Sequence, residues 1–312
     1  MPLLRRKSLI LAKTESTYAT VPSPAPAGSD AILVRNMEIT PLESDVVSRD
    51  LIRPYLGASE QLLANPRVRI TCEVELAGSG TAGTAPRYNP LLLACGMGST
   101  VSAGTSVTYA PVSSSFSSCT IVYNIDGVNH QVTGARGTVQ MNCQLGEIPT
   151  LQFEMTGIYS TPTDTAQVAA TFAAQASPLI FRDGNTSAFS FMSYAGCLMS
   201  VEFNVNNSVV YRELIGCTKE ILITDRQAEG TVVIEAPTMA QKNYFTEALG
   251  TSTGSLTFLH GTTAGNRVTF TAAQSDVGQP TYSETDGVMM LNIPFTATPT
   301  TAGNNEFSLA FT

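Results

Sequence analysis

The chain of 312 residues has no tryptophan and only two histidines, His130 and His260. Charged residues are also scarce, at 13% against roughly 25% in ordinary soluble domains. Two histidines cannot build a multi-histidine metal centre. The net charge of −8 argues against a protein that grips nucleic acid or an anionic membrane through a basic surface. Hydrophobic residues still make up 43% of the chain, which excludes full disorder.

The six cysteines lack any CxxC pair, and their spacing of about twenty residues or more fits no zinc or iron–sulfur pattern. We expect reduced thiols from a cytosolic folding compartment, with disulfides as the alternative. No run of 18 apolar residues occurs, and the run Ser8–Ala12 is too short for a signal peptide or a membrane span. We therefore expect no membrane partner.

Glycine, proline, serine, threonine and valine are abundant, which is typical of a β-rich, turn-rich protein. Val68–Leu76 alternates apolar and polar residues like a half-buried strand, and Asp126-Gly127 between two strand-like runs predicts a type I′ hairpin. A second hairpin is predicted from Val201–Val205 and Val209–Leu214. Low surface charge is a liability for a free monomer, so it favours a protein covered by copies of itself.

The order of predicted elements repeats along the chain, as strands, one helix and strands again. Short helices are predicted at Pro86–Ala94 and Thr238–Leu249. An overlay places Leu151, Phe153 and Met155 on Leu291, Ile293 and Phe295. The predicted division is an extended N-terminal arm (1–30), a first domain (31–160), a linker (161–187) and a second domain (188–312).

Residues 43–66 are predicted to form a long irregular segment that is too apolar to be left in water. We expect it to pack on another subunit. The candidate contact residues are its large apolar side chains, Leu51, Ile52, Tyr55, Leu56, Leu62 and Leu63.

Motifs that could carry chemistry are weak. Gly78–Gly83 reads GSGTAG, a literal GxGxxG, but two prolines displace the following helix and no acidic residue follows to bind a ribose. Neither histidine lies near a nucleophile motif, so both are expected to be ordinary surface or turn residues. Glu73 and Glu75 share one face of a strand, which is more often a solvated surface than a pair of catalytic carboxylates. We expect no enzyme activity, no catalytic residue, no cofactor and no bound metal.

Several segments, taken in order, are similar to one known family. They read AILVRNMEITPLESDVVSRDLIRPYLG, VRITCEVELAGSGTAGTAPRYNPLLLACG, VTGARGTVQMNCQLGEIPTLQFEMTGIY, VVYRELIG, ITDRQAEGTVVIEAPT and GSLTFLHGTTAGN. They resemble the major tail tube protein of long-tailed, non-contractile bacteriophages and related prophages, over nearly the whole chain. The resemblance implies a mainly β fold with two tandem tail tube domains, each a β-sandwich or open barrel with one flanking α-helix.

The resemblance also implies a function and partners. It implies a structural virion protein that self-assembles into stacked rings, assembled in the host cytoplasm, with DNA passing through the lumen without specific binding. A duplicated chain implies a homotrimeric, pseudo-hexameric ring, with a homohexamer as the alternative. A tape measure protein and tail terminator or distal tail proteins are the further partners. From the residues alone, a carbohydrate-binding or adhesin-like β-sandwich remains the alternative, although the absence of tryptophan weighs against it.

Overall fold

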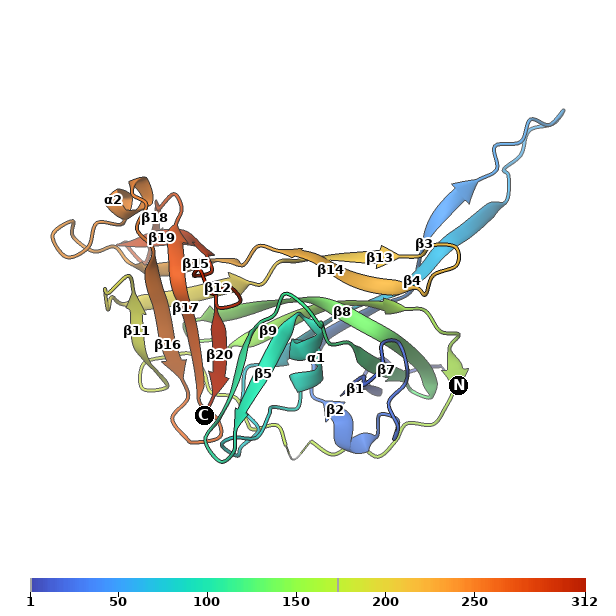
Figure 1. Ribbon diagram of the computed structural model, residues 1–312, viewed down its shortest axis with the longest axis horizontal. Helices are drawn as coiled ribbons and strands as arrows, with labels where there is room; N and C mark the ends of the chain where they lie inside the picture. The colour runs from blue at the N-terminus through green and yellow to red at the C-terminus, as the bar shows by residue number, and fades with distance from the viewer. Residues whose placement is uncertain (1, 173) are drawn as a thin grey trace.

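The computed structural model describes residues 2–172 and 174–312 and is mainly β, as predicted (Figure 1). Its strands form one large branched sheet and a separate two-stranded hairpin. Within the large sheet, eight antiparallel strands pair one after another through both halves of the chain, and this series is here called the eight-stranded sheet. Its order is β3 (Arg35–Ser48), β4 (Gln61–Glu75), β9 (Thr150–Ile158), β8 (Val128–Gln144), β12 (Leu198–Asn204), β15 (Glu229–Glu235), β19 (Val288–Ala297) and β18 (Thr281–Thr285).

The remaining strands complete the two halves. The first half adds β1 (Ser8–Thr14), β2 (Ala31–Ile32), β5 (Met97–Ser102), β6 (Ser106–Pro111), β7 (Cys119–Ile125) and β10 (Thr163–Asp164). The second half adds β11 (Thr186–Phe191), β16 (Gly254–His260), β17 (Val268–Val277), β20 (Ser308–Phe311) and the separate hairpin of β13 (Asn207–Arg212) and β14 (Glu220–Arg226). The helices are α1 (Asn89–Ala94) and α2 (Tyr244–Leu249), with one 3₁₀ turn at Gly28–Asp30.

The strands of the two halves pair in the same order. In the first half the order is β1–β7–β8–β9–β4–β3. In the second it is β11–β16–β17/β18–β19–β15–β12, where β17 and β18 pair with opposite ends of β19. The helix follows β4 in one half and β15 in the other. This repeat is the pattern expected of a duplicated domain.

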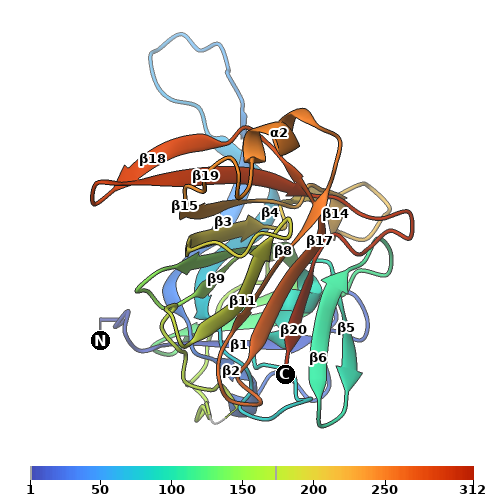
Figure 2. The same cartoon turned by 90° about the vertical axis from the view of Figure 1, so that its left-hand side faces the viewer.

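The two halves share main-chain pairing and one hydrophobic core. Residues Ser200–Asn204 of β12 pair with Gln140–Gln144 of β8, and β20 pairs with β6, beside which it lies in Figure 2. Phe203 on β12 is 3% exposed, and its ring centroid lies 4.8 Å from that of Phe270 and 4.9 Å from that of Phe307. Each half therefore completes the burial of the other, since one continuous apolar cluster joins them.

The N-terminal segment, expected to be an extended arm over residues 1–30, contains a strand. All seven residues of β1 pair with β7, because Ile10, Leu11 and Ala12 are apolar enough to join the core. The chain after β1 is also tied down. The buried carboxylate of Glu15 accepts hydrogen bonds from Ser118, Thr120 and the main chain of Gly134, among others.

Of the two predicted hairpins, the structure confirms one and contradicts the other, and the second predicted helix is shorter than expected. The hairpin at Asp126-Gly127 is confirmed, with φ values of 45° and 107° that suit a type I′ turn. The hairpin between Val201–Val205 and Val209–Leu214 is wrong, because β12 pairs with β15 and β13 with β14. Helix α2 starts only at Tyr244, where the Asn243 side chain accepts a hydrogen bond from the main chain of Thr246.

His260 is a buried structural residue, 2% exposed, and not the surface or turn histidine that was expected. Its Nδ1 lies 3.0 Å from Oγ1 of Thr186 and its Nε2 lies 3.2 Å from the carbonyl oxygen of Leu179. A carbonyl can only accept, so Nε2–H donates to Leu179 and the Thr186 hydroxyl donates to Nδ1. Burial lowers the pKa of His260 below its usual value, so the neutral ring is the form that the fold holds.

We predict that His260 makes stability depend on pH. The unfolded chain binds this proton more readily, so the contribution is complete above about pH 6.5 and is lost as pH falls through that value. In urea unfolding, His260→Gln should cost about 1–2 kcal/mol at neutral pH. It should also show a smaller loss of stability between about pH 7 and pH 5.5 than the unsubstituted protein. Equal pH dependence in the two proteins would contradict the assignment.

Candidate assembly surfaces

In the ranges 2–172 and 174–312, no group of three or more His, Cys, Asp or Glu side chains is placed to hold a metal. No helix in the same part of the chain is long and apolar enough to cross a membrane. Glu73 accepts a hydrogen bond from Asn36 at 2.8 Å and Glu75 lies 3.9 Å from Arg35, so this carboxylate pair has ordinary surface partners.

The glycine-rich loop of residues 78–83 is a packing element. Gly78 N donates to Oδ1 of Asn266 at 2.8 Å, and Gly80 N donates to the carbonyl of Gly265 at 3.0 Å. A Cβ at Gly78 would lie 2.0 Å from that same carbonyl oxygen. Glycine is therefore required there because two backbones meet, and this use leaves no open cradle for a phosphate.

The cysteines are unpaired thiols. Cys72, Cys95, Cys119 and Cys143 are buried, and burial raises the pKa of Cys72 to about 12. A thiol that stays protonated is a poor nucleophile, so these four residues act as small apolar core residues.

Residues 43–67, here called the arm, extend β3 and β4 beyond the eight-stranded sheet (Figure 1). The irregular part is shorter than predicted, since β3 continues to Ser48 and β4 begins at Gln61. The structure brings all six predicted contact residues onto this one arm, and every one is exposed. Ile52 and Leu56 are the extreme cases, each at 103% exposure. Apolar side chains gathered on an exposed projection are typical of a protein contact surface.

The base of the arm is held by ion pairs. Arg67 lies 2.7 Å from Glu43 and 3.3 Å from Asp45, and Arg69 lies 3.1 Å from Glu43. Hydrogen bonding from Arg67 lowers the pKa of Glu43 below its usual value. The arm therefore has an ordered base and an apolar tip.

The β13–β14 hairpin is the counterpart of the arm in the second half, because it connects β12 to β15 as the arm connects β3 to β4. Unlike the arm, it packs across the first half of the chain. Ile221 is 0% exposed there. Arg136 donates to the carbonyl of Ile221 at 2.6 Å, and Nδ2 of Asn207 donates to the carbonyls of Cys95 and Gly137. The sequence did not predict this packing, because the alternation of apolar and polar residues in a hairpin does not show which part of the fold the hairpin will cover.

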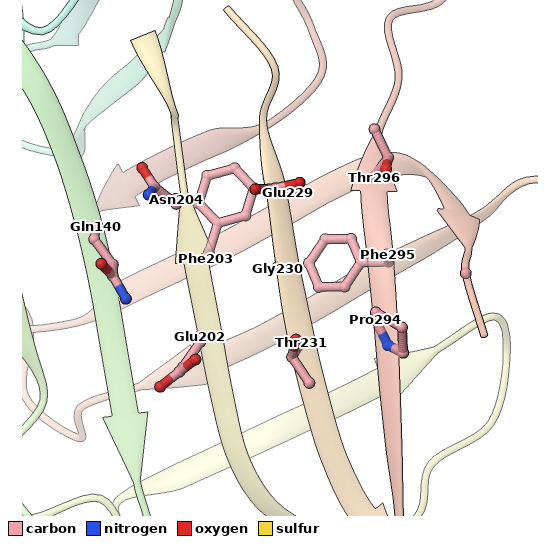
Figure 3. Close-up of a pocket in the computed structure, with 11 residues that line it drawn as sticks. Gln140, Glu202, Phe203, Asn204, Glu229, Gly230, Thr231, Pro294, Phe295 and Thr296 are labelled. Atoms are coloured by element: carbon pink, nitrogen blue, oxygen red, sulfur yellow. The ribbon is translucent and has the colours of Figure 1, made fainter. Parts of the chain in front are cut away.

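The eight-stranded sheet has one apolar and one polar face. On β4, for example, Ile70 and Cys72 are buried, while Arg69 and Thr71 at the alternate positions face outward. A hollow of about 330 Å³ lies on the polar face and crosses β8, β12, β15 and β19. Figure 3 shows the residues that line it. Glu202 and Glu229 line it beside Gln140, Asn204 and Thr231. The polar face was not singled out from the sequence, although the alternation of these strands contains it.

This polar face has an acidic excess. Its arginines are engaged with carboxylates, Arg35 with Glu75, Arg67 with Glu43 and Asp45, and Arg69 with Glu43 and Glu154. Glu38 and Glu202 are exposed and form no ion pair with any residue that the structure describes. The polar face therefore exposes carboxylates that have no ion-pair partner in the described part of the chain, among neutral amide and hydroxyl side chains.

The eight-stranded sheet ends in two open edges. Among the described residues, β3 pairs only with β4 and β18 pairs only with β19. An open strand edge presents unpaired main-chain N–H and C=O groups, which makes it a template for another strand.

Comparison with known protein families finds one match. Residues 5–297 match a family described as phage tail tube protein. A search of curated proteins finds no match.

We predict that Leu56→Asp blocks self-assembly and leaves the monomer intact. Leu56 is fully exposed, so the change should alter monomer stability by less than about 0.5 kcal/mol. A carboxylate buried in a contact without a partner costs several kcal/mol. Sedimentation and negative-stain images would show monomers for Leu56→Asp and normal assemblies for the control Leu56→Met. Normal assemblies from both variants would place the arm tip outside the contacts.

Proposed function

The chain belongs to the phage tail tube protein family, and from this membership we propose that it is the major tail tube subunit of a long-tailed, non-contractile phage. The family is structural, which indicates a non-enzymatic component of the virion. In this proposal rings of the subunit stack into the hollow tail tube through which the genome is delivered. The supporting observation is the eight-stranded sheet, with its buried apolar face, its acidic polar face and its two open edges.

Closing that sheet around an axis favours three chains per ring. Strands lie about 4.8 Å apart and barrel strands tilt by roughly 35–45°, so three chains give a barrel roughly 45–50 Å across between backbones. Inward side chains would leave roughly 35 Å, which admits a DNA duplex about 20 Å wide. Two chains would leave a bore about as narrow as the duplex itself. Six would give roughly 95 Å between backbones, far more than DNA requires.

The polar face is the surface that suits the lumen. Carboxylates such as Glu202 and Glu229 repel phosphate groups, so DNA would slide along the face instead of binding it. The opposite face is covered by the rest of the fold and stabilises the subunit. The two units of the ring wall in each chain are residues 31–160 and 188–312.

The arm is the proposed contact between rings, through its six exposed apolar residues. The ends of the tube would meet tail terminator and distal tail proteins, and the lumen would hold the tape measure protein before DNA passes. Assembly would take place in the host cytoplasm. Purified protein, concentrated and examined by electron microscopy, should form rings or tubes with about three copies per ring. Persistent monomers would contradict the proposal.

We predict that Glu202→Lys converts the lumen into a surface that retains DNA. Each ring would gain lysines on the polar face, and phosphate contacts of this kind weaken steeply as salt rises. Tubes of this variant should form normally and co-sediment with short DNA fragments at low salt, whereas unsubstituted tubes should not. The matched control is Asp164→Lys, on the exposed strand β10 outside the eight-stranded sheet. Equal DNA retention by both variants would show that the polar face does not line the lumen.

A further inference from the structure

One chain contains a complete joint between two sheet edges. On the eight-stranded sheet β12 adds to β8, with Glu202 opposite Asn142 and Phe203 opposite Met141. Phe203 and Met141 are both 3% exposed, so this joint is dry on its core side. The turn that follows β8 completes the joint, since Leu145 N donates to the carbonyl of Met199 at 3.0 Å and Gly146 N to that of Phe181 at 2.9 Å.

The open edges β3 and β18 occupy the same places in their own halves as β12 and β8. In the first half, Ile39 lies opposite Ile70, and Ile70 lies opposite Met155. In the second half, Phe203 lies opposite Gly230, and Gly230 lies opposite Phe295. Ile39 therefore occupies the position in the first half that Phe203 occupies in the second. Tyr282 lies opposite Leu291 as Met141 lies opposite Leu151. In the free chain, however, Ile39 is only half-buried and Tyr282 is 51% exposed.

The site in the second half where the β8–β9 turn docks also has a counterpart in the first half. At the base of β1, β2 and β3 lies a cavity of about 720 Å³, lined by Arg5, Arg6, Arg35, Leu9, Leu33 and Phe172 among others. Arg5 and Arg6 form no ion pair with any described residue. The turn corresponding to Leu145-Gly146 is Asp286-Gly287, between β18 and β19, and both of its residues are exposed.

We infer that the joint between two copies of this chain repeats the joint inside one copy. Strand β3 of one copy adds antiparallel to β18 of the next, with Glu38 opposite Ser283, Ile39 opposite Tyr282 and Thr40 opposite Thr281. The β18–β19 turn of that next copy enters the cavity beside Arg35. This inference rests on the proposed function, because it assumes a ring of copies.

The charges of the β18–β19 turn and of the cavity are complementary, which supports this docking. Glu284 and Asp286 approach the cavity in this register, and the cavity wall carries Arg5 and Arg6, which form no ion pair with any described residue. In the internal joint the corresponding positions are the apolar Cys143 and Leu145. The internal joint is therefore apolar and the external joint ionic, so an edge that meets the wrong partner would leave charges without partners.

Paired cysteines test the register. Residues directly opposite in antiparallel strands have Cα atoms about 4.5–5.5 Å apart, within reach of a disulfide. In a Cys197→Ser, Cys217→Ser background, which removes the exposed thiols, Ile39→Cys with Tyr282→Cys should form intermolecular disulfides in assembled tubes. The matched control is Ile39→Cys with Glu284→Cys, a diagonal pair about 7–8 Å apart that should link far less.

The covalent products also count the copies. A ring closed through this joint gives a ladder on non-reducing gels that ends at three chains for a trimer and at six for a hexamer. Tubes that form without the Ile39–Tyr282 link, or that link equally in the control, would overturn the joint and leave the proposed tube function standing. A failure of the unsubstituted protein to assemble at all would overturn both.

Charge reversal tests the turn in its cavity. Glu284→Arg with Asp286→Arg should raise the concentration needed for assembly by about tenfold or more, because like charges would meet at the arginines. Arg5→Glu with Arg6→Glu should do the same. In a mixture of the two variants, every joint between unlike copies matches and every joint between like copies does not. Alternating copies cannot close a ring of three, so the mixture should form open oligomers, and the quadruple variant should recover assembly. Unchanged assembly of both charge variants would show that the turn does not dock there.

Discussion

The eight-stranded sheet depends on one constraint, which is that main-chain hydrogen-bonding groups at a strand edge need partners. Within a chain the constraint is met at β8, whose outer edge receives β12 from the other half. It is unmet at β3 and β18 in the part of the chain that the structure describes. A sheet can escape open edges only by closing on itself or by gaining strands from another chain. The open ends are therefore the feature on which the proposed ring depends.

The division of side chains between the faces follows from the same sheet. Because strand residues alternate, a strand such as β4 sends Ile70 and Cys72 to the core and Arg69 and Thr71 to the other face. The low charge of the whole chain suits the proposed lumen, since a face that does not bind DNA needs amides, hydroxyls and a few carboxylates and no basic clusters. Pairing of Arg35, Arg67 and Arg69 with carboxylates keeps positive charge from standing free on that face.

The sequence predicted what local physical chemistry decides. The β-rich class, the Asp126-Gly127 turn and the apolar surplus at Leu51–Leu63 follow from residue preferences over short stretches. Pairings between distant strands do not, which is why β13 was assigned to β12 although it pairs with β14. The burial of His260 was missed for a similar reason, because its partners Leu179 and Thr186 lie far away in sequence. The polar face and the two open edges became visible only once the order of the strands was known.

In the proposed ring, two related units in one chain can do something that six identical subunits cannot, because their joints can differ. The internal joint is sealed by Phe203 and Met141 and needs no second molecule, so it forms when the chain folds. The external edges carry Arg35, Glu38 and Glu284, and β18 is only five residues long. Short strands and charged residues discourage unspecific pairing of an edge, so a free subunit can stay soluble until a matching edge arrives. If the external joint is the ionic one proposed above, salt weakens it more than the apolar internal joint, and the reversible step of assembly then lies between chains and not within them.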